Sequence, residues 1–322
     1  MVIDGISTPL LFTDKFSVGY PNNPLLINLN LNLIAGELVC FMGPNGIGKS
    51  SLIKTLINFL QPLGGSFQYC ESGPIERVVS VVLTDRVQHP QLTVKELITM
   101  GRYPFLDWRM TLTKEDDSVI DLAIRQTNIE HLRNRKITEL SDGQMQMAMI
   151  ARALAQNTKV ILLDEPTAHL DLNNRVEIMK MLKGLTRETN RGILIATHEL
   201  DLALQTADRV WIAGPDKTIK EGIPEDLVLN GSFDEVFKFK GYDLKTGKVS
   251  HEAFRGKTVS IIGEGYALLW TKNALERNGY SVNDSAGITI NIASDASLIK
   301  WSFNQTDYSS LESLLKDLEL VA

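Results

Sequence analysis

The residues best suited to chemistry lie in one short run, G-P-N-G-I-G-K-S, at positions 43–50. The run fits the pattern G-x-x-x-x-G-K-[ST] at every fixed position, and the glycines of that pattern let backbone N–H groups close around phosphate oxygens. The pattern predicts that Lys49 reaches the β- and γ-phosphates of a nucleotide and that the Ser50 hydroxyl ligates Mg²⁺. The predicted phosphate-binding residues are Gly43, Pro44, Asn45, Gly46, Gly48, Lys49, Ser50 and Ser51.

A pair of acids offers the complementary chemistry. Asp164 and Glu165 follow V-I-L-L at 160–163, a short apolar run that is typical of a buried strand. An acid at this place can support Mg²⁺, directly or through water, and we assign that role to Asp164. Glu165 is then the candidate for orienting and deprotonating an attacking water. The alternative, two surface carboxylates without a function, is less consistent with an apolar strand that leads into both acids.

The elements around these residues predict a layered α/β domain. An apolar run at 38–42 enters the phosphate loop as a buried strand, and apolar residues at helical spacing up to position 60 follow the loop. Further apolar strands are predicted at 160–163 and 192–196. Continuous apolar strands separated by helices indicate a parallel sheet that is covered on both faces.

Two other patterns flank this core. Residues 8–37 alternate apolar and polar side chains, as half-exposed strands do, and residues 93–137 change to helical spacing. Thr93 and Glu96 form a capping box at the start of that segment, and a second helix is expected over 114–127.

The C-terminal part of the chain predicts a separate small α/β domain. A transition at 230–248 leads to a strand at 259–262, a helix at 267–278, a strand at 288–292 and a last helix that begins with a capping box at 309–312. The run G-E-G at 263–265 resembles the start of a dinucleotide fingerprint but lacks its third glycine, so a tight strand-to-helix turn is the better interpretation. Trp270 and Trp301 are expected to be core residues or interface anchors.

Composition narrows the function classes. Of the 322 residues 43% are hydrophobic and 22% charged, with a formal net charge of −6, so the basic footprint of a nucleic-acid-binding protein is missing. Two cysteines and five scattered histidines predict neither a disulfide framework nor a zinc site. No apolar stretch has the length of a membrane span, and residues 1–5 do not resemble a secretion signal. These features predict a cytosolic protein.

The run L-S-D-G-Q at 140–144, just before the strand at 160–163, resembles the signature L-S-G-G-Q of the ATP-binding cassette (ABC) family. The resemblance implies that Ser141, Gly143 and Gln144 contact the nucleotide, with Ser141 and Gly143 at the γ-phosphate held by a partner subunit. A helix N-terminus is an anion site, which suits this role. Ser141 and Gln144 also fit a capping box, and both roles can hold at once. Asp142 departs from the family's glycine and places a negative charge near that phosphate.

The remaining family elements follow in order. His198, after the strand at 192–196, matches the switch histidine that holds the γ-phosphate and water, and Asp171 closes the run A-H-L-D, which matches the loop that crosses the dimer interface. Tyr20 matches the aromatic residue that stacks on adenine. Thr84 stands where the family has a Mg²⁺-ligating Gln, and Gln88 or Gln91 are alternatives for that ligand.

The resemblance spans residues 8–230 and implies an architecture and an assembly. It implies a P-loop NTPase cassette, with a RecA-like core, an antiparallel β subdomain and a helical insert, over residues 1–235, and an accessory, regulatory α/β domain over 236–322. Two copies would enclose two ATP molecules with Mg²⁺ in a head-to-tail dimer. The partners would be separate membrane-spanning permease subunits and, indirectly, a solute-binding protein. The chain would then lie on the cytoplasmic face of the inner (plasma) membrane.

The run G-R-Y-P at 101–104 resembles a motif in importer subunits for iron–siderophore, haem and cobalamin. The resulting expectation is the ATP-hydrolysing subunit of such an importer. A helix stop followed by a proline turn is the structural alternative for the motif. Two other functions remain open: a soluble ABC ATPase that remodels a protein complex, and an amino-acid importer subunit with a ligand-sensing C-terminal domain.

Overall fold

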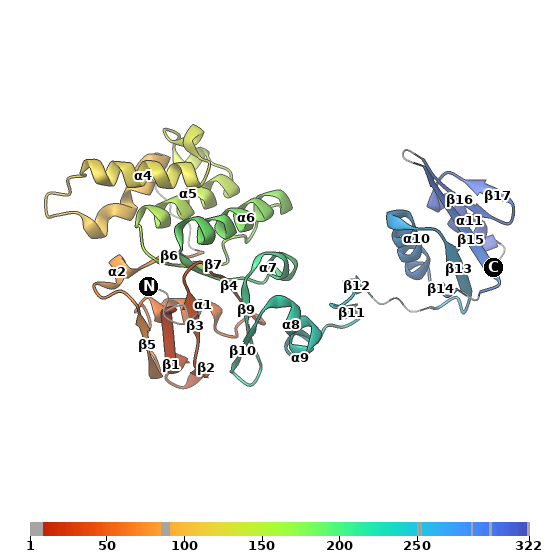
Figure 1. Ribbon diagram of the computed structural model, residues 1–322, viewed down its shortest axis with the longest axis horizontal. Helices are drawn as coiled ribbons and strands as arrows, with labels where there is room; N and C mark the ends of the chain where they lie inside the picture. Colours follow the sequence, from red (N-terminus) through yellow and green to blue (C-terminus); the bar gives the residue numbers. More distant parts are fainter. Residues whose placement is uncertain are drawn as a thin grey trace. The chain divides into compact units, whose positions relative to one another are not determined.

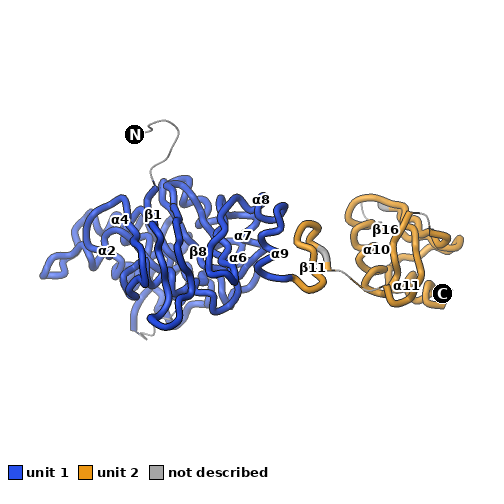
Figure 2. The backbone as a smooth tube through the Cα atoms, turned by 90° about the horizontal axis from the view of Figure 1, so that it is seen from below, with its two compact units in different colours: residues 1–238 blue, residues 239–322 orange. Residues whose placement is uncertain are grey.

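A computed structural model describes residues 9–84, 91–249, 251, 253–284, 286–295 and 298–320. The chain forms two compact units, residues 1–238 and residues 239–322 (Figure 2). Each unit has its own sheet and its own hydrophobic core.

A six-stranded sheet forms the centre of the first unit (Figure 1). Its strand order is β10-β9-β4-β8-β7-β6. All neighbouring pairs are parallel except β9 with β10. All residues of β4, β7 and β8 are buried, which confirms a sheet covered on both faces. The strands are β4 (Leu38–Met42), β6 (Val79–Val82), β7 (Val160–Asp164), β8 (Gly192–Ala196), β9 (Arg209–Ala213) and β10 (Ile219–Gly222).

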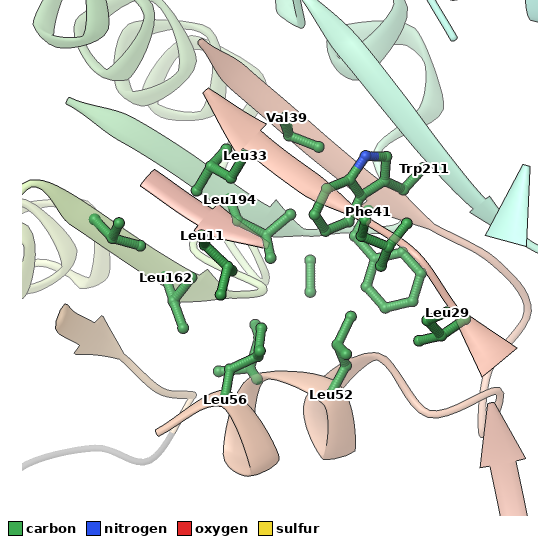
Figure 3. Close-up of a cluster of buried hydrophobic side chains, with 14 of the residues drawn as sticks. Leu11, Leu29, Leu33, Val39, Phe41, Leu52, Leu56, Leu162, Leu194 and Trp211 are labelled. Atoms are coloured by element: carbon green, nitrogen blue, oxygen red, sulfur yellow. The ribbon is translucent and has the colours of Figure 1, made fainter. Parts of the chain in front are cut away.

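A second, antiparallel sheet precedes and flanks this centre. It contains β1 (Pro9–Tyr20), β2 (Asn23–Leu29), β3 (Asn32–Ile34) and β5 (Gly64–Tyr69), with β1 paired to the other three. The alternating pattern at 8–37 is therefore confirmed as half-exposed strands. The helix α1 (Lys49–Leu56) packs between the layers, and Figure 3 shows Leu52 and Leu56 facing Leu162, Leu194 and Phe41. The helix is shorter than the apolar spacing up to position 60 predicted, because Asn58 turns left-handed with φ 60°.

Helices form the rest of the first unit, and α6 and α7 lie against β4 while α6 also contacts β8. Both expected helices of the insert are present, each with its capping box, at Thr93 and at Thr113. The remaining elements are α2 (Ile75–Val78), α3 (Val94–Thr99), the 3₁₀ helices η1 (Met100–Phe105), η2 (Glu130–Leu132) and η3 (Ile137–Glu139), α4 (Lys114–Gln126), α5 (Asp142–Ala155), α6 (Leu172–Thr189), α7 (Leu200–Thr206), α8 (Pro224–Leu229) and α9 (Ser232–Phe237).

The G-R-Y-P run has a structural role in the helical insert. It continues α3 as the 3₁₀ helix η1, which holds Pro104 inside it. Arg102 is buried. Its Nε donates to Asp116 Oδ1 at 2.8 Å, and its Nη1 donates to the carbonyl oxygen of Ala155 at 3.1 Å. Gly101 lies directly on α5, because a Cβ there would be 2.2 Å from the carbonyl oxygen of Arg152. The run therefore joins α3, α4 and α5.

This contact gives a stability prediction. Gly101→Ala forces a methyl group against the backbone of α5, and such overpacking costs about 1–3 kcal/mol of unfolding free energy. Gly184→Ala is the matched control, since that glycine lies in α6 with nothing within 4 Å of the added Cβ. The control should gain about 0.5–1 kcal/mol from helix propensity. Urea unfolding of both variants checks the difference, and equal stability would contradict the packing described.

The second unit is a five-stranded sheet with the order β14-β13-β15-β16-β17, and two helices that pack on its core. β13 runs parallel to β14 and β15, whereas β16 and β17 are antiparallel additions. A short hairpin of β11 (Tyr242–Asp243) and β12 (Lys248–Val249) precedes them. The other elements are β13 (Thr258–Ile262), α10 (Gly265–Arg277), β14 (Ser281–Val282), β15 (Ile288–Asp295), β16 (Leu298–Phe303), β17 (Thr306–Tyr308) and α11 (Leu311–Leu320).

Three sequence expectations are corrected or refined in this unit. The tight turn after β13 is confirmed, but α10 already begins at Gly265, which has φ 64°. The cap of α11 is Ser310, whose Oγ accepts the N–H of Ser313 at 3.2 Å, so the predicted box at 309–312 is wrong by one residue. Trp301 is buried and donates to Thr271 at 2.7 Å, whereas Trp270 is 65% exposed and is not a core residue.

Candidate nucleotide-binding site

The chemistry-bearing residues of the first unit meet at the carboxyl edge of the central sheet, the end at which its parallel strands terminate. The phosphate loop follows β4 and His198 follows β8, while Asp164 ends β7 and Glu165 comes directly after it. These three strands are neighbours. Backbone hydrogen bonds join the three strand ends: Thr197 N–H donates to the Phe41 carbonyl at 3.0 Å, and Glu165 N–H to the Ala196 carbonyl at 2.9 Å. Groups up to 155 residues apart therefore surround one place on the sheet.

The phosphate loop has the backbone that its glycines predicted. Gly46 and Gly48 have φ of 79° and 117°, values that favour glycine. Lys49 begins α1 and is buried, and its Nζ donates to the carbonyl oxygen of Gly43 at 2.9 Å, across the mouth of the loop. Burial lowers the pKa of this ammonium group, and the nearby carboxylates of Glu165 and Asp164 partly oppose the shift. The loop thus presents a desolvated cation beside the N-terminus of a helix, which is an anion site.

Glu165 and His198 form the reactive pair of the edge. His198 Nδ1 lies 2.6 Å from Glu165 Oε2. Glu165 has a left-handed φ of 51°, an uncommon value for a non-glycine residue and one that clusters at functional sites. Its carboxylate is mostly shielded, while the imidazole of His198 is about half exposed. A carboxylate base held by an imidazole can accept a proton from a bound water.

The signature run lies at the start of α5. The Ser141 Oγ accepts the N–H of Gln144 at 3.3 Å, and Gln144 Oε1 accepts the N–H of Ser141 at 3.1 Å, which confirms the capping box. Gly143 is buried against α6, because a Cβ there would be 2.9 Å from the side chain of Asn174. Asp142 occupies the first turn of α5. The contact of this helix end with a partner's nucleotide stays a prediction.

Asp171 has a local role that the family resemblance did not indicate. It caps α6, with Oδ1 accepting the N–H of Asn174 at 3.0 Å and Oδ2 accepting the Asn174 side-chain amide at 2.6 Å. Asn174 therefore contacts both the Asp171 carboxylate and Gly143 of the signature run. The expected nucleotide contact of Asp171 remains a prediction.

Tyr20 and Thr84 are predicted site residues whose side chains, among the residues that the structure describes, make no hydrogen bond or ion pair with the groups at the carboxyl edge. Tyr20 ends β1 and is half exposed, and Thr84 is exposed two residues after β6, the strand beside β7. Of the alternatives for the Mg²⁺ ligand, Gln88 lies outside the described residues, and Gln91 Oε1 accepts from Lys136 at 3.2 Å.

Two further residues of the edge were not predicted from the sequence. Arg175, one turn into α6, donates from Nη1 to both carboxylate oxygens of Glu199 at 2.8 and 2.7 Å. Glu199 directly follows His198, and its Oε1 is 3.7 Å from His198 Nε2. The position of Glu199 beside the histidine is the one signal in the sequence that could have drawn attention to the pair.

A phosphate loop, an acidic strand end and a histidine at one edge of a parallel sheet, with a helical insert, define a nucleotide-binding ATPase domain. Two family models match the chain: "ABC transporter" over residues 26–168 and "Iron ABC transporter C-terminal domain" over residues 256–319. The chain belongs to the ABC transporter family, as an ATP-binding subunit that hydrolyses ATP.

The curated relatives include three that span most of the cassette. MJ0873, an ABC transporter ATP-binding protein of Methanocaldococcus jannaschii, is 36% identical and aligns with 75% of this chain and 84% of its own. The petrobactin import ATP-binding protein FpuC of Bacillus anthracis is 36% identical over 65% of this chain and 80% of its own. The ferric enterobactin transport ATP-binding protein FepC of Escherichia coli is 30% identical over 70% of this chain and 85% of its own.

A solved structure supports the fold. MJ1267, an ATP-binding cassette of an ABC transporter in its ADP conformation, superposes with a TM-score of 0.64 at 22% identity. The superposition covers 73% of this chain and 100% of MJ1267. This likeness shows the expected P-loop cassette architecture. In the part of the chain that the structure describes, no helix combines the length and apolarity needed to cross a bilayer.

Proposed function

We propose that this chain is the ATP-hydrolysing subunit of an importer for iron chelates of the siderophore type. The observation that carries the proposal is the match of residues 256–319 to a C-terminal domain of iron ABC transporters. Relatives at 30–36% identity whose names specify petrobactin and ferric enterobactin support the same solute class. Haem and cobalamin, which the motif at 101–104 also suggested, are the nearest alternatives.

The carboxyl edge supplies the groups for hydrolysis. The phosphate loop and Lys49 bind the phosphates of ATP, and Tyr20 stacks on the adenine. Glu165 takes a proton from the attacking water, and His198, held by Glu165 in the free protein, contacts the γ-phosphate. The second copy of the chain completes each site with Ser141, Gly143, Gln144 and Asp171, so hydrolysis needs two subunits.

The residues present also suit Mg²⁺. Ser50 and Asp164 offer hard oxygen donors at the phosphate loop and at the end of β7, and Thr84 adds a hydroxyl after β6. When bound, Mg²⁺ neutralises charge on the β- and γ-phosphates. Asp164 is buried, so a cation partner there would offset the cost of holding a charge out of water.

The assembly follows from this role. The partners are membrane-spanning permease subunits and, through them, a solute-binding protein, so the chain acts at the cytoplasmic face of the inner membrane. Residues 1–235 would form the cassette, and residues 236–322 an accessory domain that regulates it.

A transport experiment tests the proposal. In a host lacking this gene, we expect uptake of radiolabelled ferric siderophore to fall to background, and the wild-type chain, but not Glu165→Gln, to restore it. Labelled haem, cobalamin and amino acids serve as comparison solutes. Loss of only one of these would assign the importer to that solute instead. Unchanged uptake of all four, with only soluble proteins co-purifying from detergent extracts, would replace transport with a remodelling ATPase.

A further inference from the structure

Arg175 joins two segments that flank the reactive pair. From the first turn of α6 it donates twice from Nη1 to the Glu199 carboxylate, at 2.8 and 2.7 Å, and from Nε to the carbonyl oxygen of Leu170 at 2.8 Å. The exposed fractions of the two side chains are 31% for Arg175 and 18% for Glu199, so water competes little for the pair. Charge-assisted bonds of this geometry orient both partners.

His198 lies between two carboxylates. Its Nδ1 is 2.6 Å from Glu165 Oε2, and its Nε2 is 3.7 Å from Glu199 Oε1. Arg175 occupies both oxygens of Glu199, which keeps that carboxylate just beyond hydrogen-bond distance from Nε2. Without the guanidinium, a small rotation would let Glu199 accept from Nε2, and the imidazole would be held by acids on both sides.

The negative charge at the carboxyl edge of the sheet is a second reason to expect that Arg175 matters for ATP hydrolysis. Asp164, Glu165 and Glu199 carry three carboxylates there, and the triphosphate of ATP brings more negative charge. Arg175 neutralises the one carboxylate that faces neither the phosphate loop nor Mg²⁺ in the proposed site. An unneutralised Glu199 beside His198 would repel the γ-phosphate.

We propose that Arg175 is a positioning residue for ATP hydrolysis. It holds Glu199 away from His198, so that Nε2 stays available to the γ-phosphate, and it cancels the charge of that carboxylate. Through the Leu170 carbonyl it also fixes the loop at 168–171 and Glu199 relative to each other. The inference rests on the proposed function, because it assumes that His198 contacts the γ-phosphate.

The test compares steady-state ATP hydrolysis of wild type, Arg175→Met and a matched control. Methionine keeps most of the stem and removes the charge, so kcat should fall about tenfold or more and KM for ATP should rise. The control is Arg209→Met, which breaks a similar pair, Arg209 Nε with Glu37 Oε1 at 3.1 Å, at the opposite end of the sheet. Its kcat should stay within about twofold of wild type, because this pair has similar exposed fractions, 33% and 14%, but lies away from the reacting groups.

A rescue variant separates positioning from folding. In Arg175→Met/Glu199→Ala both the competing acceptor and its charge are gone, so kcat should recover most of the loss, although the double variant has lost the same salt bridge. No recovery, or equal activity of Arg175→Met and the Arg209→Met control, would overturn the inference. An inactive wild type would instead contradict the proposed function, since it leaves no activity for Arg175 to modulate.

Discussion

Glu165→Gln is expected to lower ATP turnover about a hundred- to ten-thousandfold while leaving ATP binding intact. The amide keeps the volume of the side chain and a hydrogen-bond partner for His198, but it cannot accept the proton of the attacking water. Since ATP then stays bound, the head-to-tail dimer should accumulate. Phosphate release in a single turnover, together with size-exclusion chromatography with and without ATP, measures both effects.

The matched control for Glu165→Gln is Glu37→Gln. Glu37 has a similarly shielded carboxylate, 14% exposed against 18% for Glu165, but it precedes β4 at the opposite end of the sheet. We expect near wild-type turnover in the control. Unchanged turnover in Glu165→Gln would remove this residue from the role of base, and loss of ATP binding would assign it to the binding step instead.

The convergence of the site could be predicted from the sequence because it follows from topology. Parallel strands end at one edge, so the loop after β4, the acids of β7 and the histidine after β8 had to approach one another once the strands were recognised. Glycine positions added the backbone of the loop, since Gly46 and Gly48 adopt conformations that other residues avoid. Both signals are local in sequence, which is why they can be read without a structure.

The partners of these residues could not be predicted in the same way. The ion pair of Arg175 with Glu199 joins α6 to the segment after β8, and nothing in either segment specifies which acid meets which base. Asp171 matched the family's interface loop, yet its carboxylate also caps α6, a use that only the position of the helix start reveals. Side-chain pairing across elements depends on packing, which the sequence pattern leaves open.

In the C-terminal unit, the burial of individual apolar side chains could not be predicted from the sequence either. Trp270 and Trp301 were equivalent in the sequence, but one is 65% exposed on α10 and the other is buried on β16. The capping box was expected to begin at Ser309, but the N–H of Ser313 donates to the Oγ of Ser310, the next residue. Helical periodicity therefore located the helices while leaving the face and the first residue of each undecided.

Lys49→Ala is expected to weaken ATP binding about ten- to a hundredfold, because charged hydrogen bonds to phosphate are lost, and hydrolysis should become undetectable. In the free protein the ammonium group is held by the carbonyl oxygen of Gly43 at 2.9 Å, so the loop keeps it ready for the phosphates. Titration with a fluorescent ATP analogue measures the affinity. Lys54→Ala, one turn further along the same α1, is the control and should bind as wild type does.

The pH dependence of the affinity distinguishes a phosphate contact from a structural role of Lys49. Burial lowers the pKa of Lys49 from its ordinary value of 10.5 in the free protein, and bound phosphates stabilise the ammonium form, which raises that pKa again. Binding at alkaline pH must then take up a proton, so wild-type affinity should fall as the pH rises through the lowered pKa of the free protein. Lys49→Ala has no such proton to bind and should show a flatter profile over the same range. Parallel profiles for the two proteins would mean that Lys49 stays charged in the free loop or does not reach the phosphates.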